Sequence, residues 1–228
     1  MPGWSRSFAA LFGAITASAV FVSPGYTHFD QPTPSVPKAE TRAFFDLNLI
    51  GGVKLVITTV DAMEKWERVR QDLLSDATAS NPKAAPWIEW AQNLSSLSPK
   101  ERLMAINVRV NQRITYKIDQ LQWNVSDYWQ TPSESIDLGT GDCEDYAILK
   151  AYLAVKAGFT LDNLSVLTGA LAPNNQAHAV LVARDGNAFY VLDSRSPLMM
   201  TVDGRNDIKP LFSVTANDVW LYRKPAGQ

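Results

Sequence analysis

The sequence predicts an α+β fold in which helices come first and an antiparallel sheet follows. Apolar side chains recur at three- and four-residue spacing up to about residue 157, which is the period of a helix with one buried face. From residue 164 onward they alternate with polar side chains, as they do in strands. Helices segregated from an antiparallel sheet define the α+β class. With 228 residues, 46% of them hydrophobic, the chain can bury one sizeable core.

Two helical regions are expected before residue 115. Region 60–97 carries apolar residues at helical spacing, although Pro82 and Pro86 interrupt the pattern. The next helix has a stronger start signal, because Ser98 fits the N-cap and Glu101 the third helical position of a capping box.

Residues 116–141 are aromatic and rich in turn residues, and we expect a long ordered loop over the core. A third helix is expected from Cys143 to Ala157, with Gly158 as its left-handed cap. The expected strands are Leu164–Gly169, Ala177–Arg184 and Ala188–Asp193, with Val219–Tyr222 as a candidate fourth.

The N-terminus indicates export. Arg6 precedes an apolar run that ends at Val22 and contains Ala17-Ser18-Ala19, the pattern of a secretory signal with a small-x-small cleavage site. The alternative is an uncleaved membrane anchor, although about 15 apolar residues are short for a span. We therefore expect a signal peptide over 1–22, a proline-rich linker over 23–39, a folded domain over 40–225, and a periplasmic location.

Composition excludes some functions. With 21 basic and 23 acidic residues the net charge is −2, which gives no electrostatic argument for nucleic acid as a partner. The single cysteine, Cys143, cannot form an intrachain disulfide or a zinc site of several thiolates.

An Asp-Gly pair between two alternating apolar runs predicts a two-residue hairpin turn at Asp185-Gly186. Pairing Arg184 with Asn187 and counting outward places His178 opposite Asp193. Opposed Cβ atoms lie about 4.5–5.5 Å apart, so the carboxylate could accept a hydrogen bond from the imidazole. The alternatives are a polar pair at the sheet edge or a one-residue slip, which would put the two side chains on opposite faces.

Cys143 follows two glycines and opens the third helix, where unpaired N–H groups and the helix dipole favour a thiolate. The alternative is a buried structural cysteine. Three acids surround it, Asp142, Glu144 and Asp145, and their negative charge disfavours a thiolate. They predict either a bound hard cation such as Ca²⁺ or helix capping, with Asp142 as N-cap and Asp145 at the third position. The residues alone leave both open.

These motifs, taken together, resemble those of the bacterial transglutaminase-like cysteine proteinases. The resemblance covers roughly residues 40–222 and rests on four segments: Asp127-Tyr128-Trp129-Gln130-Thr131-Pro132 with Glu134, Gly141-Asp142-Cys143-Glu144-Asp145-Tyr146-Ala147, Ala177-His178-Ala179-Val180-Leu181, and Val191-Leu192-Asp193. One departure is Ser194-Arg195, since the family often has Asn after the aspartate.

The resemblance implies a papain-like, transglutaminase-core fold with the catalytic triad Cys143, His178 and Asp193. It implies a calcium site at Asp142, Glu144 and Asp145. The best-known members are periplasmic, calcium-dependent proteases that release large surface adhesins and thereby act on biofilms. In those members an inner-membrane receptor that responds to cyclic di-GMP sequesters the protease.

The leading hypothesis is therefore a periplasmic cysteine endopeptidase. Two alternatives remain: an acyl transferase of transglutaminase type, and a non-catalytic calcium-binding interaction module. The Cys143 N–H is the expected oxyanion donor, with Trp129 as a guess for the second.

Overall fold

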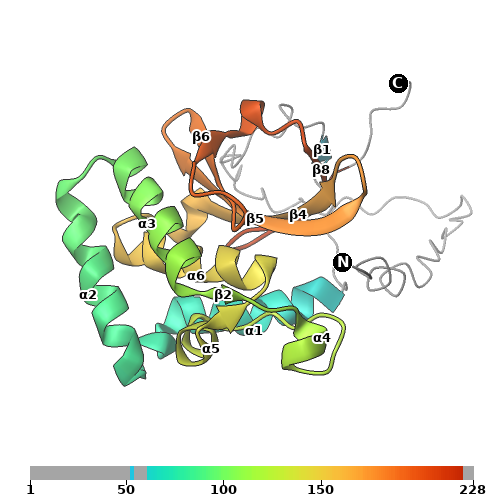
Figure 1. The fold of residues 1–228 in the computed structure, drawn as a ribbon. Helices are drawn as coiled ribbons and strands as arrows, with labels where there is room; N and C mark the ends of the chain where they lie inside the picture. Colours follow the sequence, from blue (N-terminus) through green and yellow to red (C-terminus); the bar gives the residue numbers. More distant parts are fainter. Residues whose placement is uncertain (1–51, 54–60, 223–228) are drawn as a thin grey trace, which may run out of the picture. The chain divides into compact units, whose positions relative to one another are not determined.

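The structure is a computed structural model that describes residues 52–53 and 61–222, all within one compact unit, Leu47–Gln228. The predicted signal peptide (1–22) and linker (23–39) lie outside the described residues. In Figure 1 helices occupy one side of a curved sheet, which confirms the α+β class.

Six α-helices are described, and their bounds agree with the main sequence signals. They are α1 (Asp61–Ser75), α2 (Ala85–Asn93), α3 (Pro99–Arg113), α4 (Asp119–Gln122), α5 (Pro132–Leu138) and α6 (Cys143–Lys156). Short 3₁₀ turns, Ala77–Ser80 and Pro82–Ala84, separate α1 from α2, as the prolines predicted. The capping box at Ser98 and Glu101 is confirmed, and it starts α3.

The expected loop over 116–141 is wrong in part, because it contains two short helices. Helix α5 has its own capping box, in which Thr131 is the N-cap and Glu134 the third residue. Gly139, with φ of 63°, ends this helix in the left-handed region. Strands β2 (Thr115–Tyr116) and β3 (Thr140–Gly141) then pair in parallel and tie the two ends of the segment together.

The main sheet is antiparallel and, in the described part of the chain, has the order β1-β9-β8-β4-β5-β6-β7. Its strands are β1 (Gly52–Val53), β4 (Leu164–Leu171), β5 (Gln176–Asp185), β6 (Ala188–Leu192), β7 (Met200–Thr201), β8 (Ile208–Val214) and β9 (Val219–Tyr222). All the expected strands are present. Strand β8 was missed because Pro210 lies in its centre, where proline normally argues against a strand.

The predicted hairpin exists, but its register is wrong by two residues. Asp185 pairs with Ala188, so Gly186 and Asn187 form the turn and Val182 faces Val191. Gly186 has φ of 59°, which suits glycine at the first central position of a two-residue turn. An even shift keeps every side chain on its predicted face, because strand side chains alternate with period two.

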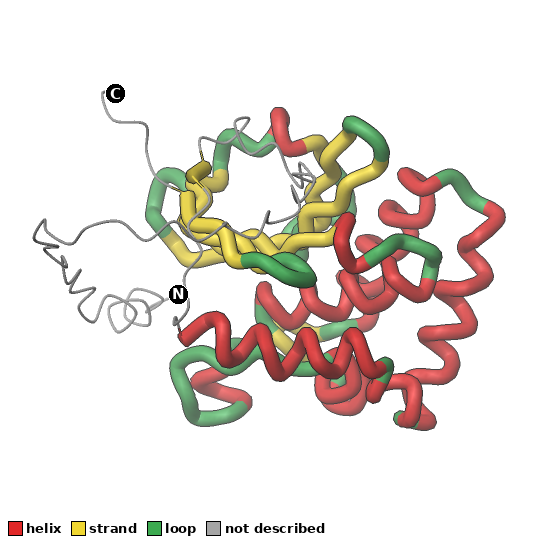
Figure 2. The backbone as a smooth tube through the Cα atoms, turned by 180° about the vertical axis from the view of Figure 1, so that it is seen from behind, coloured by secondary structure: helices red, strands yellow, loops and turns green. Residues whose placement is uncertain are grey.

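Helix α6 lies at the centre of the fold. It packs against β4 and β5 on one side and against α2, α3 and α5 on the other. Figure 2, seen from behind, shows these helices gathered beside the sheet. Small residues such as Ala147, Ala151 and Ala154 are almost fully buried and let the helix approach the sheet. In the described residues, none of the helices has both the length and the apolar character needed to cross a bilayer.

Candidate active site

Cys143 is the first residue of α6, as predicted, and is partly buried. The first intrahelical bond runs from Tyr146 N to Asp142 O over 3.1 Å, so the N–H groups of Cys143 and Glu144 have no acceptor within the helix. The Cys143 sulfur lies 3.2 Å from Glu144 Oε2. Helix α6 also packs against β5, the strand that carries His178. The helix start thus brings the thiol to the strand that carries the histidine.

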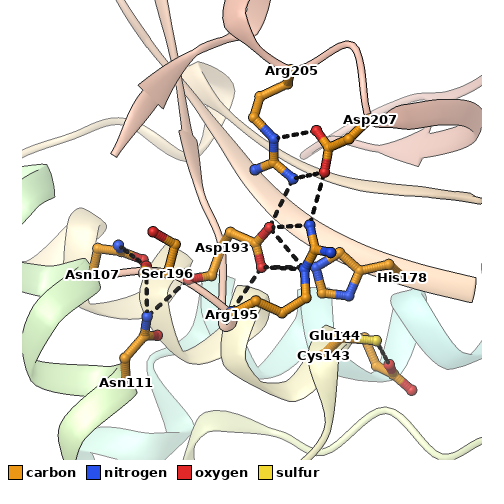
Figure 3. A network of polar contacts seen from close by, with 10 residues as sticks. All are labelled: Asn107, Asn111, Cys143, Glu144, His178, Asp193, Arg195, Ser196, Arg205 and Asp207. Atoms are coloured by element: carbon orange, nitrogen blue, oxygen red, sulfur yellow. Dashed lines mark hydrogen bonds and ion pairs between the residues drawn. The ribbon is translucent and has the colours of Figure 1, made fainter. Parts of the chain in front are cut away.

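His178 and Asp193 are hydrogen-bonded, which confirms the predicted neighbourhood. His178 Nε2 lies 2.8 Å from Asp193 Oδ1, and both side chains are buried. An ionised carboxylate only accepts hydrogen bonds, so Nε2 carries the proton and Nδ1 is left as the basic nitrogen. In Figure 3 the His178 ring lies between the Asp193 carboxylate and the Cys143 sulfur.

Burial alone would raise the pKa of the Asp193 carboxyl, but hydrogen bonds from His178 and from Arg195 lower it far below its ordinary value. The carboxylate is therefore ionised at neutral pH. That is the state that fixes the tautomer of His178 and stabilises its imidazolium form.

Helix α3 holds the chain segment that carries Asp193. Asn111 Nδ2 donates to Asp193 O over 2.8 Å and to Ser196 O over 2.9 Å. Asn107 Nδ2, one turn earlier, donates to Ser196 O over 2.9 Å. Because Asp193 lies just after the end of β6, these amides replace the ladder bonds that would otherwise fix it.

The acids around Cys143 gather with a residue that the sequence analysis did not select. Asp119, at the start of α4, lies with Asp142 and Asp145 so that one carboxylate oxygen from each is within 4.8 Å of the others. Asp119 and Glu144 form a second such group with Asp127, and Asp142 and Glu144 form a third with Cys143. No local motif marks Asp119. It reaches the site because β2, three residues earlier, pairs with β3, which leads into α6.

Asp145 does act as a capping residue, as one of the two open readings proposed. Its Oδ2 accepts the Asp142 N–H over 3.0 Å and the Gln130 Nε2 over 2.6 Å, and its Oδ1 accepts the Gln130 N–H over 2.8 Å. Its hydrogen bonds therefore tie the helix start to the segment before α5.

Asp119 and Asp142 are different, because each keeps a buried carboxylate oxygen, Oδ1, that has no hydrogen-bond partner in the described structure. Burial first, and then the charge of Asp142, raise the pKa of Asp119 to about 7. Burial and the neighbouring acids likewise raise the pKa of Glu144 well above its ordinary value. Burial, followed by the charge of Asp142, raises the pKa of the Cys143 thiol to about 12.

These residues fit a hard cation. Ca²⁺ binds carboxylate oxygens, and the two unpartnered oxygens of Asp119 and Asp142 are what such an ion would satisfy. Asp145 caps the helix and also belongs to the group that Asp119 and Asp142 form, whereas Glu144 belongs to the other two groups. The structure thus places Asp119 within one group with Asp142 and Asp145, two of the residues predicted to bind calcium.

Trp129, the guess for a second oxyanion donor, belongs to the core. It is 4% exposed, and its ring packs edge-on against Trp66 with centroids 6.4 Å apart. Its carbonyl accepts a hydrogen bond from Arg68. These contacts give Trp129 a structural role in joining α1 to the segment before α5.

Comparison with known families places this site in context. The sequence model of one family, described as bacterial transglutaminase-like cysteine proteinase, matches residues 89–206. That range includes Cys143, His178 and Asp193. None of the curated proteins matches the chain.

Solved structures of Legionella pneumophila LapG are similar to the chain. One is 31% identical and aligns with a TM-score of 0.54 over 68% of this chain and 86% of that chain. Calcium-bound LapG is 29% identical, with a TM-score of 0.56 over 69% of this chain and 91% of that chain. EGTA-treated LapG aligns over 68% of this chain and 84% of that chain, with 31% identity and a TM-score of 0.54.

Proposed function

Because the chain belongs to the bacterial transglutaminase-like cysteine proteinase family and is a cysteine protease, we propose that it is a calcium-dependent periplasmic endopeptidase with Cys143 as its nucleophile. The observation that carries the proposal is the hydrogen-bonded His178–Asp193 pair beside a cysteine that opens a buried helix.

Cys143 Sγ attacks the peptide carbonyl carbon, and His178 Nδ1 accepts the thiol proton. His178 then returns that proton to the leaving amine when the C–N bond breaks. Water hydrolyses the resulting thioester, with His178 again as the base. Asp193 holds Nε2 throughout and stabilises the imidazolium. The Cys143 N–H, which has no acceptor within the helix, donates to the oxyanion.

Asp119 would hold the calcium ion together with the predicted ligands Asp142, Glu144 and Asp145. The finding that supports this is the buried, unpartnered Oδ1 of Asp119 and of Asp142, within the groups of acids around Cys143. A bound ion would neutralise the acids and fix the segment that leads into α6, without contacting substrate. The existence of calcium-bound and EGTA-treated forms of LapG is consistent with such a site in a relative.

The calcium proposal can be separated from capping by substitution. Asn is as good an N-cap as Asp, so Asp142→Asn keeps the helix start and removes the charge. We expect calorimetry to show loss of calcium binding in Asp142→Asn and Glu144→Gln. Cys143→Ser and the exposed α2 control Glu89→Gln should bind calcium like the wild type.

Hydrolysis and iodoacetamide labelling of Cys143 should both fall when EGTA removes the ion, and calcium should restore them. If Asp142→Asn binds calcium normally and EGTA leaves the labelling rate unchanged, the acids serve only to cap the helix.

The proposed substrate is a large surface adhesin, cut near its N-terminus, and the proposed regulator is an inner-membrane receptor that responds to cyclic di-GMP. Both proposals rest on the family resemblance. Mass spectrometry of proteins released from cells that produce either wild type or Cys143→Ser tests the substrate. We expect one large surface protein with a new N-terminus in the wild type alone. Capture of the receptor from membranes by Cys143→Ser, only with added cyclic di-GMP, tests the regulator.

The periplasmic location has its own test. Mass spectrometry of the protein from the exporting cell should show a mature start between about residues 20 and 30, given the cleavage signal near Ala19. Recovery of the full-length chain from the cytoplasm alone would overturn the location without touching the chemistry.

A further inference from the structure

Asp193 has more partners than a triad needs. Besides His178, its carboxylate accepts hydrogen bonds from two arginines: in Figure 3 Arg205 lies above it and the guanidinium group of Arg195 beside it. Arg205 Nη2 lies 2.8 Å and Arg195 Nη2 lies 3.0 Å from Asp193 Oδ2. The Arg195 backbone N–H donates to Oδ1 over 2.9 Å.

A second carboxylate, Asp207, holds both arginines. Arg205 Nε donates to Asp207 Oδ1 over 2.7 Å and Arg205 Nη2 to Oδ2 over 3.0 Å, which is a two-point contact. Arg195 Nη2 donates to the same Oδ2 over 3.0 Å. Two carboxylates and two guanidinium groups therefore form one closed network beside His178.

The two arginines differ in burial. The Arg205 side chain is 8% exposed and the Arg195 side chain 45%. Arg195 Nε also makes long contacts to Asp193, of 3.3 and 3.4 Å. A buried ion pair is screened little by water, whereas a half-exposed one contributes less. Moreover, loss of the Arg195 side chain leaves its backbone bond to Asp193 in place.

From this geometry we propose that Arg205, braced by Asp207, is the positioning residue of the triad: it fixes Oδ2 of Asp193 so that Oδ1 faces His178 Nε2. The inference rests on the proposed function of Asp193. Arg205 acts through that carboxylate and does not touch the substrate. The turn that carries Asp207, just before β8, thereby takes part in orienting the histidine.

The test compares Arg205→Met with Arg195→Met, a control that removes the same charge from the same carboxylate. The measurement is the rate at which iodoacetamide alkylates Cys143 in calcium-saturated, full-length mature protein. Arg205→Met should slow alkylation on the order of tenfold, a typical coupling within one ion-pair network. Arg195→Met should slow it less. Arg205→Lys, which keeps the charge but not the two-point contact, should restore part of the rate.

A double-mutant cycle separates positioning from general loss of structure. If Arg205 acts through Asp193, Arg205→Met should cost nothing further in the Asp193→Ala background. Equal losses in both backgrounds, or no loss in the single variant, would overturn the proposal.

Nuclear magnetic resonance supplies a readout if any of these variants folds poorly. The downfield proton on His178 Nε2 should shift or broaden in Arg205→Met and in Asp207→Asn, and persist in Arg195→Met. An unchanged signal in both Arg205→Met and Asp207→Asn would also sink the proposal. Neither the alkylation rate nor the magnetic resonance signal requires a protein substrate. Failure to find hydrolysis would therefore count against the proposed function, while the role of Arg205 could still be tested.

Discussion

Two groups of carboxylates flank His178, and they differ in what balances their charge. On the strand side, Asp193 and Asp207 are matched by Arg195 and Arg205. On the thiol side, Asp119, Asp142 and Glu144 take no part in the ion pairs of the described residues. Asp127, which forms a group with Asp119 and Glu144, is paired with Lys65.

The comparison shows that the charge that orients the histidine and the charge beside the nucleophile are treated differently. The negative charge of Asp193, which orients the histidine, is paired with two arginines of the same chain. We therefore expect this pairing to be the same with and without calcium. The acids beside the nucleophile take part in none of the ion pairs of the described residues, and the proposed calcium ion would supply the missing positive charge. Substitutions on the two sides should therefore have opposite effects on stability.

The largest effect is expected on the balanced side. Asp193→Ala leaves Arg205 buried with one carboxylate instead of two, and removing one member of a buried pair costs about 3–5 kcal/mol. The free energy of unfolding, measured with urea, should fall by that order both in calcium and in EGTA. Loss of the triad aspartate should also slow hydrolysis, by roughly 10⁴-fold if the effect matches that in serine proteases. An equal unfolding free energy in variant and wild type would mean that the network contributes no stability.

The opposite sign is expected on the thiol side. Asp119→Asn removes one of several like charges within a buried cluster, so in EGTA the protein should gain about 1 kcal/mol of stability. In calcium the variant should lose the stabilisation that the ion provides, because ligand charge sets the affinity. Urea unfolding in both media measures the two changes.

The exposed carboxylate Asp203 supplies the matched control, and Asp203→Asn should change neither value. If Asp119→Asn is destabilising in EGTA, the acid cluster is internally balanced, and the contrast between the two sides is lost.

The same contrast shows what the sequence could and could not predict. Cys143 was placed correctly because glycines and Asp142 mark a helix start locally. His178 and Asp193 were brought together correctly, although through a wrong register, because only the parity of the strand decides the face.

The residues that surround Cys143 and Asp193 in the fold could not be predicted from the sequence. Asp119 arrives through the pairing of β2 with β3, and Arg205 through the return of the chain into β8. Neither contact has a local signature, since both depend on tertiary packing. Two features did have readable signals: the capping box at Thr131 and Glu134, and the alternation in β8 that Pro210 obscured.

The smallest effect is expected at Lys150, a fully buried cation on α6 whose Nζ has no hydrogen-bond partner in the described structure. Burial lowers the pKa of Lys150 to about 7, while the charge of Asp193 opposes the change. A lysine whose folded-state pKa is depressed binds fewer protons when folded, so it lowers stability below its unfolded pKa, increasingly down to about pH 7.

Lys150→Met should therefore stabilise the fold by about 1 kcal/mol at pH 6–7, the low end for replacing buried charge with an apolar side chain. The gain should shrink as the pH rises towards 10.5, the ordinary pKa of lysine. The exposed Lys100→Met is the control and should change little. Hydrolysis should be unaffected, because Arg195 and Arg205 already balance Asp193. If Lys150→Met is destabilising and slows hydrolysis, Lys150 is a third cation of the balanced side, and the arginines alone do not hold the aspartate.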